Sequence, residues 1–173
     1  MSFLPNQPTP AVVLSSQLEL FFSCRNLPKL DVNSPSDPFV VISRKDEKKN
    51  DYVRLNHTEV AKDNQSPDFT KEILVDYLFE EVQIIRLDVW DSDNSNMYDM
   101  SKHDFIGWAE FVLGDLVTAK GQKLAMKLKN KQGKPLIVKE MPASITVRCE
   151  EVKSNNDELV LAVGAKDLPK AGW

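Results

Sequence analysis

Short runs of alternating apolar and polar residues recur along the chain. In segment 17–24, Leu18, Leu20, Phe22 and Cys24 are apolar at every second position, which is typical of a strand with one buried face. Seven further segments are rich in β-branched or aromatic residues and are separated by Asn, Asp, Gly, Pro and Lys turns. They cover residues 38–43, 52–55, 72–75, 84–90, 104–112, 122–128 and 144–150. This pattern predicts an all-β protein, an eight-stranded antiparallel β-sandwich.

Helical patterns are scarce. The main helical candidates are residues 78–82 and 114–119. Both are too short to form a layer of their own, so a fold of alternating strands and helices is not expected.

The hydropathy pattern also predicts the domain organisation. Residues 1–15 are rich in Pro and small polar residues and are expected to form a flexible leader, followed by one domain over 16–151. Residues 159–173 repeat the pattern of the first strand, including its Leu-Pro-Lys ending, and 152–158 would be a linker. We interpret 159–173 as the truncated first strand of a second, similar domain. Two unrelated amphipathic strands would be the alternative.

Composition is that of an ordinary globular chain: 173 residues, 42% hydrophobic and 28% charged. The sequence contains no apolar run of membrane-spanning length and does not begin like a secretory signal, which predicts a cytoplasmic protein. A net charge of −4 argues against a nucleic-acid partner. Cys24 and Cys149 lie in alternating apolar stretches and are expected to be reduced core thiols.

Catalytic motifs are not evident, so we expect no enzyme activity and no small-molecule substrate. The chain has two histidines, no GxSxG sequence and no Gly-rich phosphate loop. His103 precedes Asp104, and a loop histidine in this setting is expected to be a surface residue.

Aspartates form the strongest chemical pattern. Asp31 and Asp37 lie in one turn, and Asp91, Asp93 and Asp104 lie in another, next to the ends of predicted strands. Carboxylates gathered in this way repel one another until a hard cation neutralises them, and calcium suits loop carboxylates better than magnesium does.

An EF-hand does not explain the run that begins at Asp91. The sixth position of that run is Asn96 where an EF-hand has Gly, and the twelfth is Lys102 where it has Glu. A calcium site would therefore need ligands from elsewhere in the chain.

Several of these segments resemble the calcium-binding loops of C2 domains: Asp31, residues 36–40, residues 91–93 and residues 101–107. The resemblance covers residues 16–151. Within that superfamily, residues 58–60, 64–67 and 79–83 resemble the first C2 domain of copines, and the truncated repeat resembles the start of their second. Copines are cytosolic proteins with two C2 domains followed by a von Willebrand type A-like domain.

The resemblance implies a set of calcium ligands: Asp31, Asp37, Asp91, Asp93 and Asp104. The last turn contains extra residues, 94–100, so Asp99 is an alternate to Asp104.

A calcium-dependent phospholipid-binding module is the function that this resemblance implies. Calcium would bridge the aspartates to anionic lipid head groups, and the protein would move from the cytoplasm to membranes, the plasma membrane above all, when calcium rises. Lipid contact is expected from four apolar residues in the two turns, unless they fold back onto the loop: Val32, Met97, Tyr98 and Met100. The alternative is a calcium-independent β-sandwich that binds protein partners.

Overall fold

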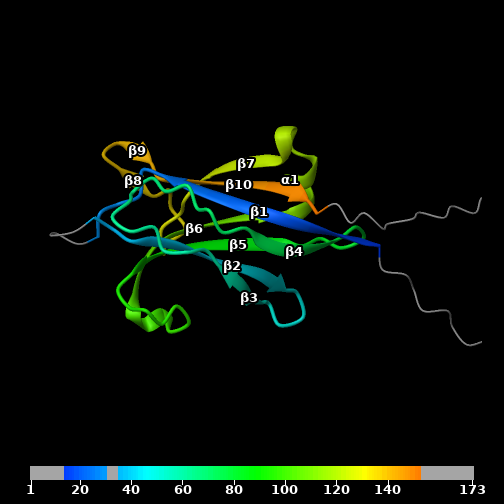
Figure 1. Cartoon of the computed structure of the whole chain (residues 1–173), viewed down its shortest axis with the longest axis horizontal. Coiled ribbons are helices and arrows are strands. Elements are labelled where there is room, and N and C mark those ends of the chain that lie inside the picture. Colours follow the sequence, from blue (N-terminus) through cyan, green and yellow to red (C-terminus); the bar gives the residue numbers. More distant parts are fainter. Residues whose placement is uncertain (1–13, 31–34, 153–173) are drawn as a thin grey trace, which may run out of the picture.

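Two four-stranded antiparallel sheets pack face to face (Figure 1). The structure is a computed structural model that describes residues 14–30 and 35–152. The first sheet has the strand order β4 (Ile73–Leu78), β1 (Ser15–Arg25), β10 (Ser144–Glu151) and β7 (Lys123–Lys127). The second sheet has the order β3 (Asp51–His57), β2 (Pro38–Asp46), β5 (Ile84–Ser92) and β6 (His103–Val112). The predicted eight-stranded β-sandwich is therefore confirmed.

Smaller elements complete the described chain. A short two-stranded hairpin consists of β8 (Ile137–Val138) and β9 (Met141–Pro142) and was not anticipated from the sequence. One α-helix, α1 (Leu113–Thr118), confirms the helical candidate at 114–119 to within a residue. Two 3₁₀ turns, η1 (Met100–Lys102) and η2 (Lys120–Gln122), precede β6 and β7.

The other helical candidate, residues 78–82, is wrong. Leu78 is the last residue of β4 and pairs with Ser15 of β1. The side chain of Gln83 accepts a hydrogen bond from the Leu78 N–H (2.8 Å) and donates one to the Asp76 carbonyl oxygen (2.8 Å). These two bonds hold the chain in a tight turn, so residues 79–82 do not form a helix.

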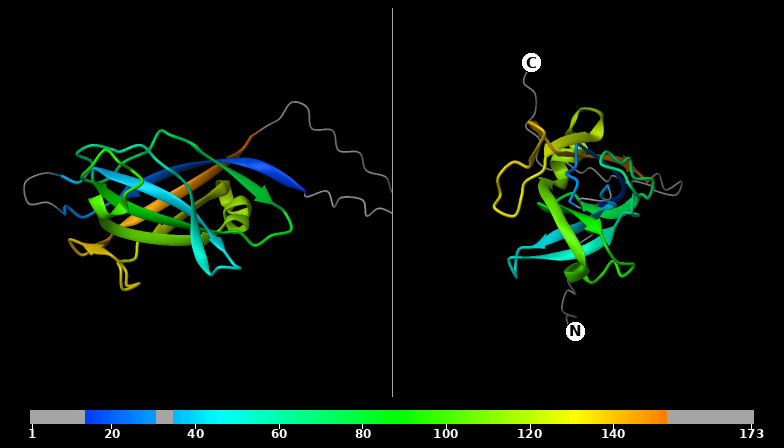
Figure 2. Two further views of the ribbon diagram at one scale, coloured as in Figure 1. Left: turned by 90° about the horizontal axis from the view of Figure 1, so that it is seen from below. Right: turned by 90° about the vertical axis from the view of Figure 1, so that its left-hand side faces the viewer.

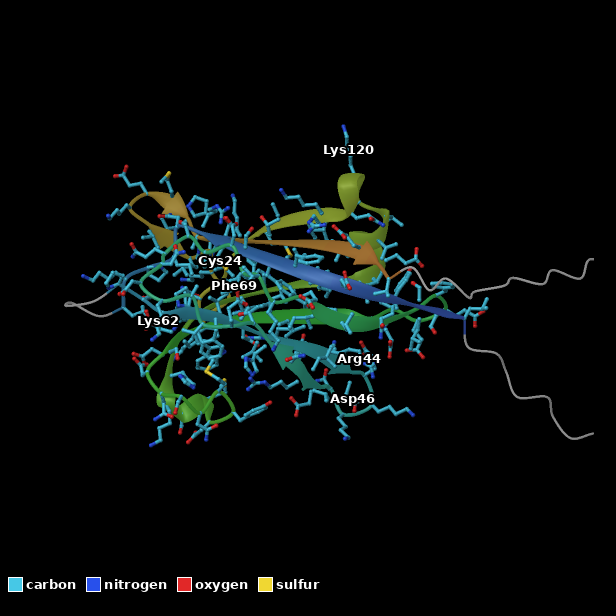
Figure 3. The ribbon with its side chains drawn as sticks, in the orientation of Figure 1. Cys24, Arg44, Asp46, Lys62, Phe69 and Lys120 are labelled. Atoms are coloured by element: carbon cyan, nitrogen blue, oxygen red, sulfur yellow. The ribbon has the colours of Figure 1, made fainter. Side chains whose placement is uncertain are left out.

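The core lies between the sheets and follows the alternation of the sequence. Leu18, Leu20 and Phe22 of β1 face the other sheet and are buried. Cys24 of β1 and Phe69, in the segment before β4, lie in the same interior (Figure 3). Cys24 and Cys149 are both buried and free, as expected. Burial raises the pKa of the Cys24 thiol to about 12, so this thiol stays protonated and unreactive.

The connections divide between the two ends of the sandwich. The described parts of the β1–β2 loop (26–30 and 35–37) and the β5–β6 loop (93–102) lie at one end, which we call the loop end (Figure 1). The turn 79–83 lies at the opposite end, where β1 begins and β10 ends (Figure 2). Within 14–30 and 35–152, no helix is both long enough and apolar enough to cross a membrane. Residues 1–13 of the expected leader, 153–158 of the linker and the whole truncated strand lie outside the described residues.

Candidate functional site

Three neighbouring strand ends carry predicted ligand residues at the loop end. Pro38, the first residue of β2, pairs with Asp91 near the end of β5, and Asp91 pairs with Asp104 near the start of β6. Directly opposite residues of an antiparallel pair project from the same face of the sheet. Asp91 and Asp104 therefore share a face, and Asp37 immediately precedes the paired Pro38.

A β-bulge sets the pairing of Asp104. The register of β5 with β6 shifts by one residue between Val89 and Trp90, so that Ile106 has no partner on β5. Without this shift, Asp91 would pair with Phe105. Because a one-residue slip moves a side chain to the other face, the bulge places a carboxylate beside Asp91 where an aromatic ring would otherwise lie.

Hydrogen bonds from the main chain fix the carboxylates of Asp37 and Asp91. Asp91, only 4% exposed, accepts the Asp37 N–H at its Oδ1 atom over 2.6 Å. The Asp37 Oδ1 atom accepts the N–H of Asp63 over 2.7 Å. Asp63 has a positive φ of 52°, which is uncommon for a residue other than Gly. Each carboxylate is thus oriented by a backbone donor and keeps further lone pairs for a cation.

His103 is buried, and the expectation that it is a surface residue is wrong. Its Nδ1 atom lies 3.3 Å from the Asp93 backbone nitrogen, and its Nε2 atom lies 2.9 Å from the Asn96 carbonyl oxygen. These contacts assign the proton to Nε2, so that Nδ1 accepts from Asp93. The ring also packs edge-to-face on Phe39, at 5.1 Å between centroids. His103 therefore holds the start of the β5–β6 loop against the second sheet.

The sequence contains one signal that favours burial of His103. The residue lies two positions before the aromatic Phe105, a spacing that places both side chains on one face of a strand. The backbone N–H of Asp93 and the carbonyl oxygen of Asn96 form the hydrogen bonds of the His103 ring. Both belong to an irregular loop whose conformation the sequence pattern does not show.

Asp99 has a local structural role. Its Oδ1 atom accepts the Ser101 N–H (3.2 Å) and the Ser101 hydroxyl (2.6 Å), which caps the turn η1. Asp104 is exposed and takes no part in this cap. Asp31 and Val32 lie outside the described residues.

The expected lipid-contact residues of the β5–β6 loop differ in exposure. Tyr98 is 77% exposed, whereas Met97 and Met100 are half-buried. The Arg54 guanidinium donates to the Met97 carbonyl oxygen (2.8 Å) and lies 4.8 Å from the centre of the Tyr98 ring. His57 contacts the same ring edge-to-face at 5.8 Å. The tip of the loop is therefore braced against β3 while Tyr98 faces solvent.

Calcium fits the residue types of this end, because aspartate carboxylates supply the hard oxygen ligands that the ion prefers. The pairing of Asp91 with Asp104 and the bond from Asp37 to Asp91 place three of these acids on neighbouring strand ends. Among the described side chains of His, Cys, Asp and Glu, no three lie close enough together to hold a metal ion. The described acids of this end are Asp37 before β2, Asp91 on β5 and Asp104 on β6, and Asp31 is not among the described side chains.

Known proteins resemble this chain over most of its length. A model of the C2 domain matches residues 20–136. Copine-D of Dictyostelium discoideum is 32% identical over 168 residues, which cover 96% of this chain and 30% of Copine-D. Copine-B of the same organism is 28% identical over 164 residues, which cover 94% of this chain and 30% of Copine-B. The chain thus spans about 30% of the length of these curated relatives.

Solved structures share the fold. The structure described as BON1-C2B has a TM-score of 0.58 at 26% identity. The match covers 80% of this chain and 92% of the BON1-C2B chain. A C2 domain of plant Extended Synaptotagmin 1 has a TM-score of 0.57 at 16% identity, with 80% and 97% of the two chains covered. The second likeness shows the fold alone.

Proposed function

Because the chain belongs to the C2 domain family, we propose that it is a calcium-dependent phospholipid-binding module that attaches to anionic membranes through its loop end. The observation that carries this proposal is the register at that end, which pairs Asp91 with Asp104 and joins Asp91 to Asp37. The resemblance of the sequence to copines supports the same role.

The residues that would hold calcium are acids of the two loops: Asp31, Asp37, Asp91, Asp93 and Asp104, with Asp99 as the alternate. When bound, calcium supplies positive charge and open coordination positions for lipid phosphate or carboxylate oxygens. The backbone N–H groups of Asp37 and Asp63 orient two of these carboxylates in advance. His103 holds the backbone of Asp93 at the start of its loop.

The same acids make attachment conditional. Without a cation, clustered carboxylates repel the negative surface of a membrane, and neutralising them removes this repulsion. Tyr98 then adds apolar contact at the tip of its loop, with Val32, Met97 and Met100 as further contacts. Burying one side chain of this size contributes about 1.5 to 3 kcal/mol. The acids thus determine when the domain binds, and the apolar residues determine how tightly.

In the cell, this module would recruit attached domains to membranes. The relatives are about three times as long as the matched region, which leaves room for such domains in them. We propose a cytoplasmic location that changes to membranes, the plasma membrane above all, when calcium rises. The proposed role is non-catalytic and involves neither nucleic acid nor a small-molecule substrate.

Vesicle sedimentation tests the proposal. Vesicles that contain phosphatidylserine should pellet the chain in calcium and not in chelator. Asp37→Asn with Asp93→Asn should remove the calcium-dependent fraction, because both changes delete ligand charge. Asp115→Asn, an exposed acid on α1 at the opposite end, is the matched control and should pellet like the wild type. Equal pelleting in calcium and in chelator would exclude calcium control.

A calcium-independent protein-interaction role is the second candidate, favoured by a surface hollow of about 420 Å³ on the outer face of the second sheet. The hollow is lined by Tyr52, Trp90, Phe105 and Trp108, among others. The indole N–H of Trp90 is buried and has no hydrogen-bond acceptor within the described chain. Aromatic residues of this kind are enriched in protein interfaces. This candidate would be supported if the chain binds a protein partner without calcium and does not bind vesicles.

A further inference from the structure

The β8–β9 hairpin is a preformed, tightly turned element. Its two-residue turn consists of Lys139 (φ 48°) and Glu140 (φ 67°), both in the left-handed region that usually favours Asn or Gly. Such strain persists only where the surrounding structure supports it. The support comes from the base of the hairpin, where Ala143 donates to the Leu136 carbonyl oxygen and Leu136 donates to that of Leu128, each over 2.8 Å.

A direct contact joins this hairpin to the loop end. The side-chain amide of Asn26, in the β1–β2 loop, donates to the carbonyl oxygens of Val138 (3.1 Å) and Met141 (3.0 Å). Figure 1 shows β8 and β9 at the end of the molecule that carries the β1–β2 and β5–β6 loops. The hairpin is therefore fixed beside one of the two loops that carry the proposed calcium ligands.

The surface of the hairpin is apolar and basic. Ile137 is 55% exposed and Met141 is 58% exposed, although both belong to strands. Lys134 and Lys139 are exposed, and neither forms an ion pair with another described residue. Glu140 is the one acid in segment 129–141, which contains four lysines in a chain of net charge −4. The structure thus places apolar side chains among basic ones at the loop end.

We propose that the β8–β9 hairpin is an additional membrane-binding element of the loop end. The register places Ile137 and Met141 on opposite faces of the hairpin, so both faces enter the interface of an anionic membrane, and Lys134 and Lys139 contact its phosphate groups. The occupant is a lipid surface because exposed apolar side chains and adjacent lysines together complement anionic head groups above an acyl region. This inference rests on the proposed function, because the calcium-binding loops bring the same end of the molecule to the membrane.

The test compares affinities for phosphatidylserine vesicles in calcium. Ile137→Ser with Met141→Ser should weaken binding by about tenfold or more, since two apolar side chains no longer leave water. Lys134→Gln with Lys139→Gln should weaken binding by about fivefold for each lysine, and less at high salt. The matched control is Val82→Ser. Val82 is an apolar residue at the opposite end with 73% of its surface exposed, and the variant should bind vesicles like the wild type.

The outcomes separate this inference from the proposed function. Wild-type affinity in the Ile137→Ser, Met141→Ser variant would overturn the inference and leave calcium-dependent binding intact. If the wild type does not bind in calcium, the proposed function fails and the inference fails with it.

A second measurement does not depend on affinity. An environment-sensitive fluorophore on Met141→Cys should shift to an apolar emission when vesicles and calcium are added, while the same label on Val82→Cys should not. Labelling is selective because Cys24 and Cys149 are buried. Equal shifts at both positions would reject a specific contact by the hairpin.

Discussion

Asp91 is the buried acid of the loop end. Its carboxylate is nearly inaccessible to solvent, accepts a backbone N–H from Asp37 and lies opposite Asp104. A buried carboxylate is costly unless hydrogen bonds or opposite charge compensate it. No ion pair with Asp91 is formed by the described Lys and Arg side chains. The calcium proposed for the loop end would supply opposite charge to this carboxylate.

A prediction at the scale of residues concerns the pKa of His57. Burial lowers its pKa below the ordinary 6.5, the bond from its Nδ1–H to the Thr58 carbonyl oxygen partly offsets this, and Lys71 and Arg54 lower it further. The unfolded chain then binds a proton more readily than the folded one, so stability is lost as pH falls through the unfolded-state pKa near 6.5. Urea unfolding from about pH 7.5 to 5.5, which brackets that pKa, should show this loss, and His57→Gln should reduce it. Identical pH slopes in the two proteins would contradict the assignment.

At the scale of elements, Gly107 controls how β6 meets the segment that leads to the β8–β9 hairpin. A Cβ atom on Gly107 would lie 2.9 Å from the Lys129 carbonyl oxygen and 3.2 Å from Leu136 Cδ2. That carbonyl oxygen accepts the Trp108 N–H over 2.8 Å, so it is not free to move away. Gly107→Ala should therefore lower the free energy of unfolding by about 1 to 3 kcal/mol.

Gly114→Ala provides the comparison for Gly107→Ala. Gly114 lies in α1, and a Cβ atom there would meet its nearest neighbour, the Tyr77 hydroxyl, at 3.5 Å, an ordinary contact. Because Ala favours helix more than Gly, this change should be neutral or stabilise by up to about 1 kcal/mol. Denaturant unfolding of both variants measures the difference, and equal stabilities would show that the space around Gly107 is not limiting.

The elements also show how far the sequence predicts the fold. Period-two alternation in 17–24, and runs of β-branched or aromatic residues bounded by turn residues elsewhere, located all eight long strands. The prediction failed at residues 78–82, where the side chain of Gln83 makes the hydrogen bonds of a turn. The pattern could not show the bulge that pairs Asp91 with Asp104, because a bulge depends on packing between strands. The β8–β9 hairpin was missed because its strands are two residues long and show no periodicity.

At the scale of the whole molecule, the proposed function assigns different roles to the two ends of the sandwich. Both loops that carry the proposed ligands and the β8–β9 hairpin lie at the loop end. β1 begins and β10 ends at the opposite end, where Val152 donates to the Gln17 carbonyl oxygen. The resemblance to C2 domains and to copines is confirmed by the family match and by the identity to Copine-D. Under the proposed function, the loop end contacts the membrane and the opposite end lies away from it.

Calorimetric titration of the chain with calcium, in the absence of lipid, tests the central claim most directly. The wild type should release or absorb heat with a saturable isotherm, because the carboxylates of the loop end coordinate the ion. Asp91→Asn should abolish this heat while the far-ultraviolet circular dichroism spectrum stays that of a β-protein, and Asp115→Asn should bind like the wild type. The claim would be contradicted by a wild-type isotherm indistinguishable from buffer dilution, or by calcium binding that persists unchanged in Asp91→Asn.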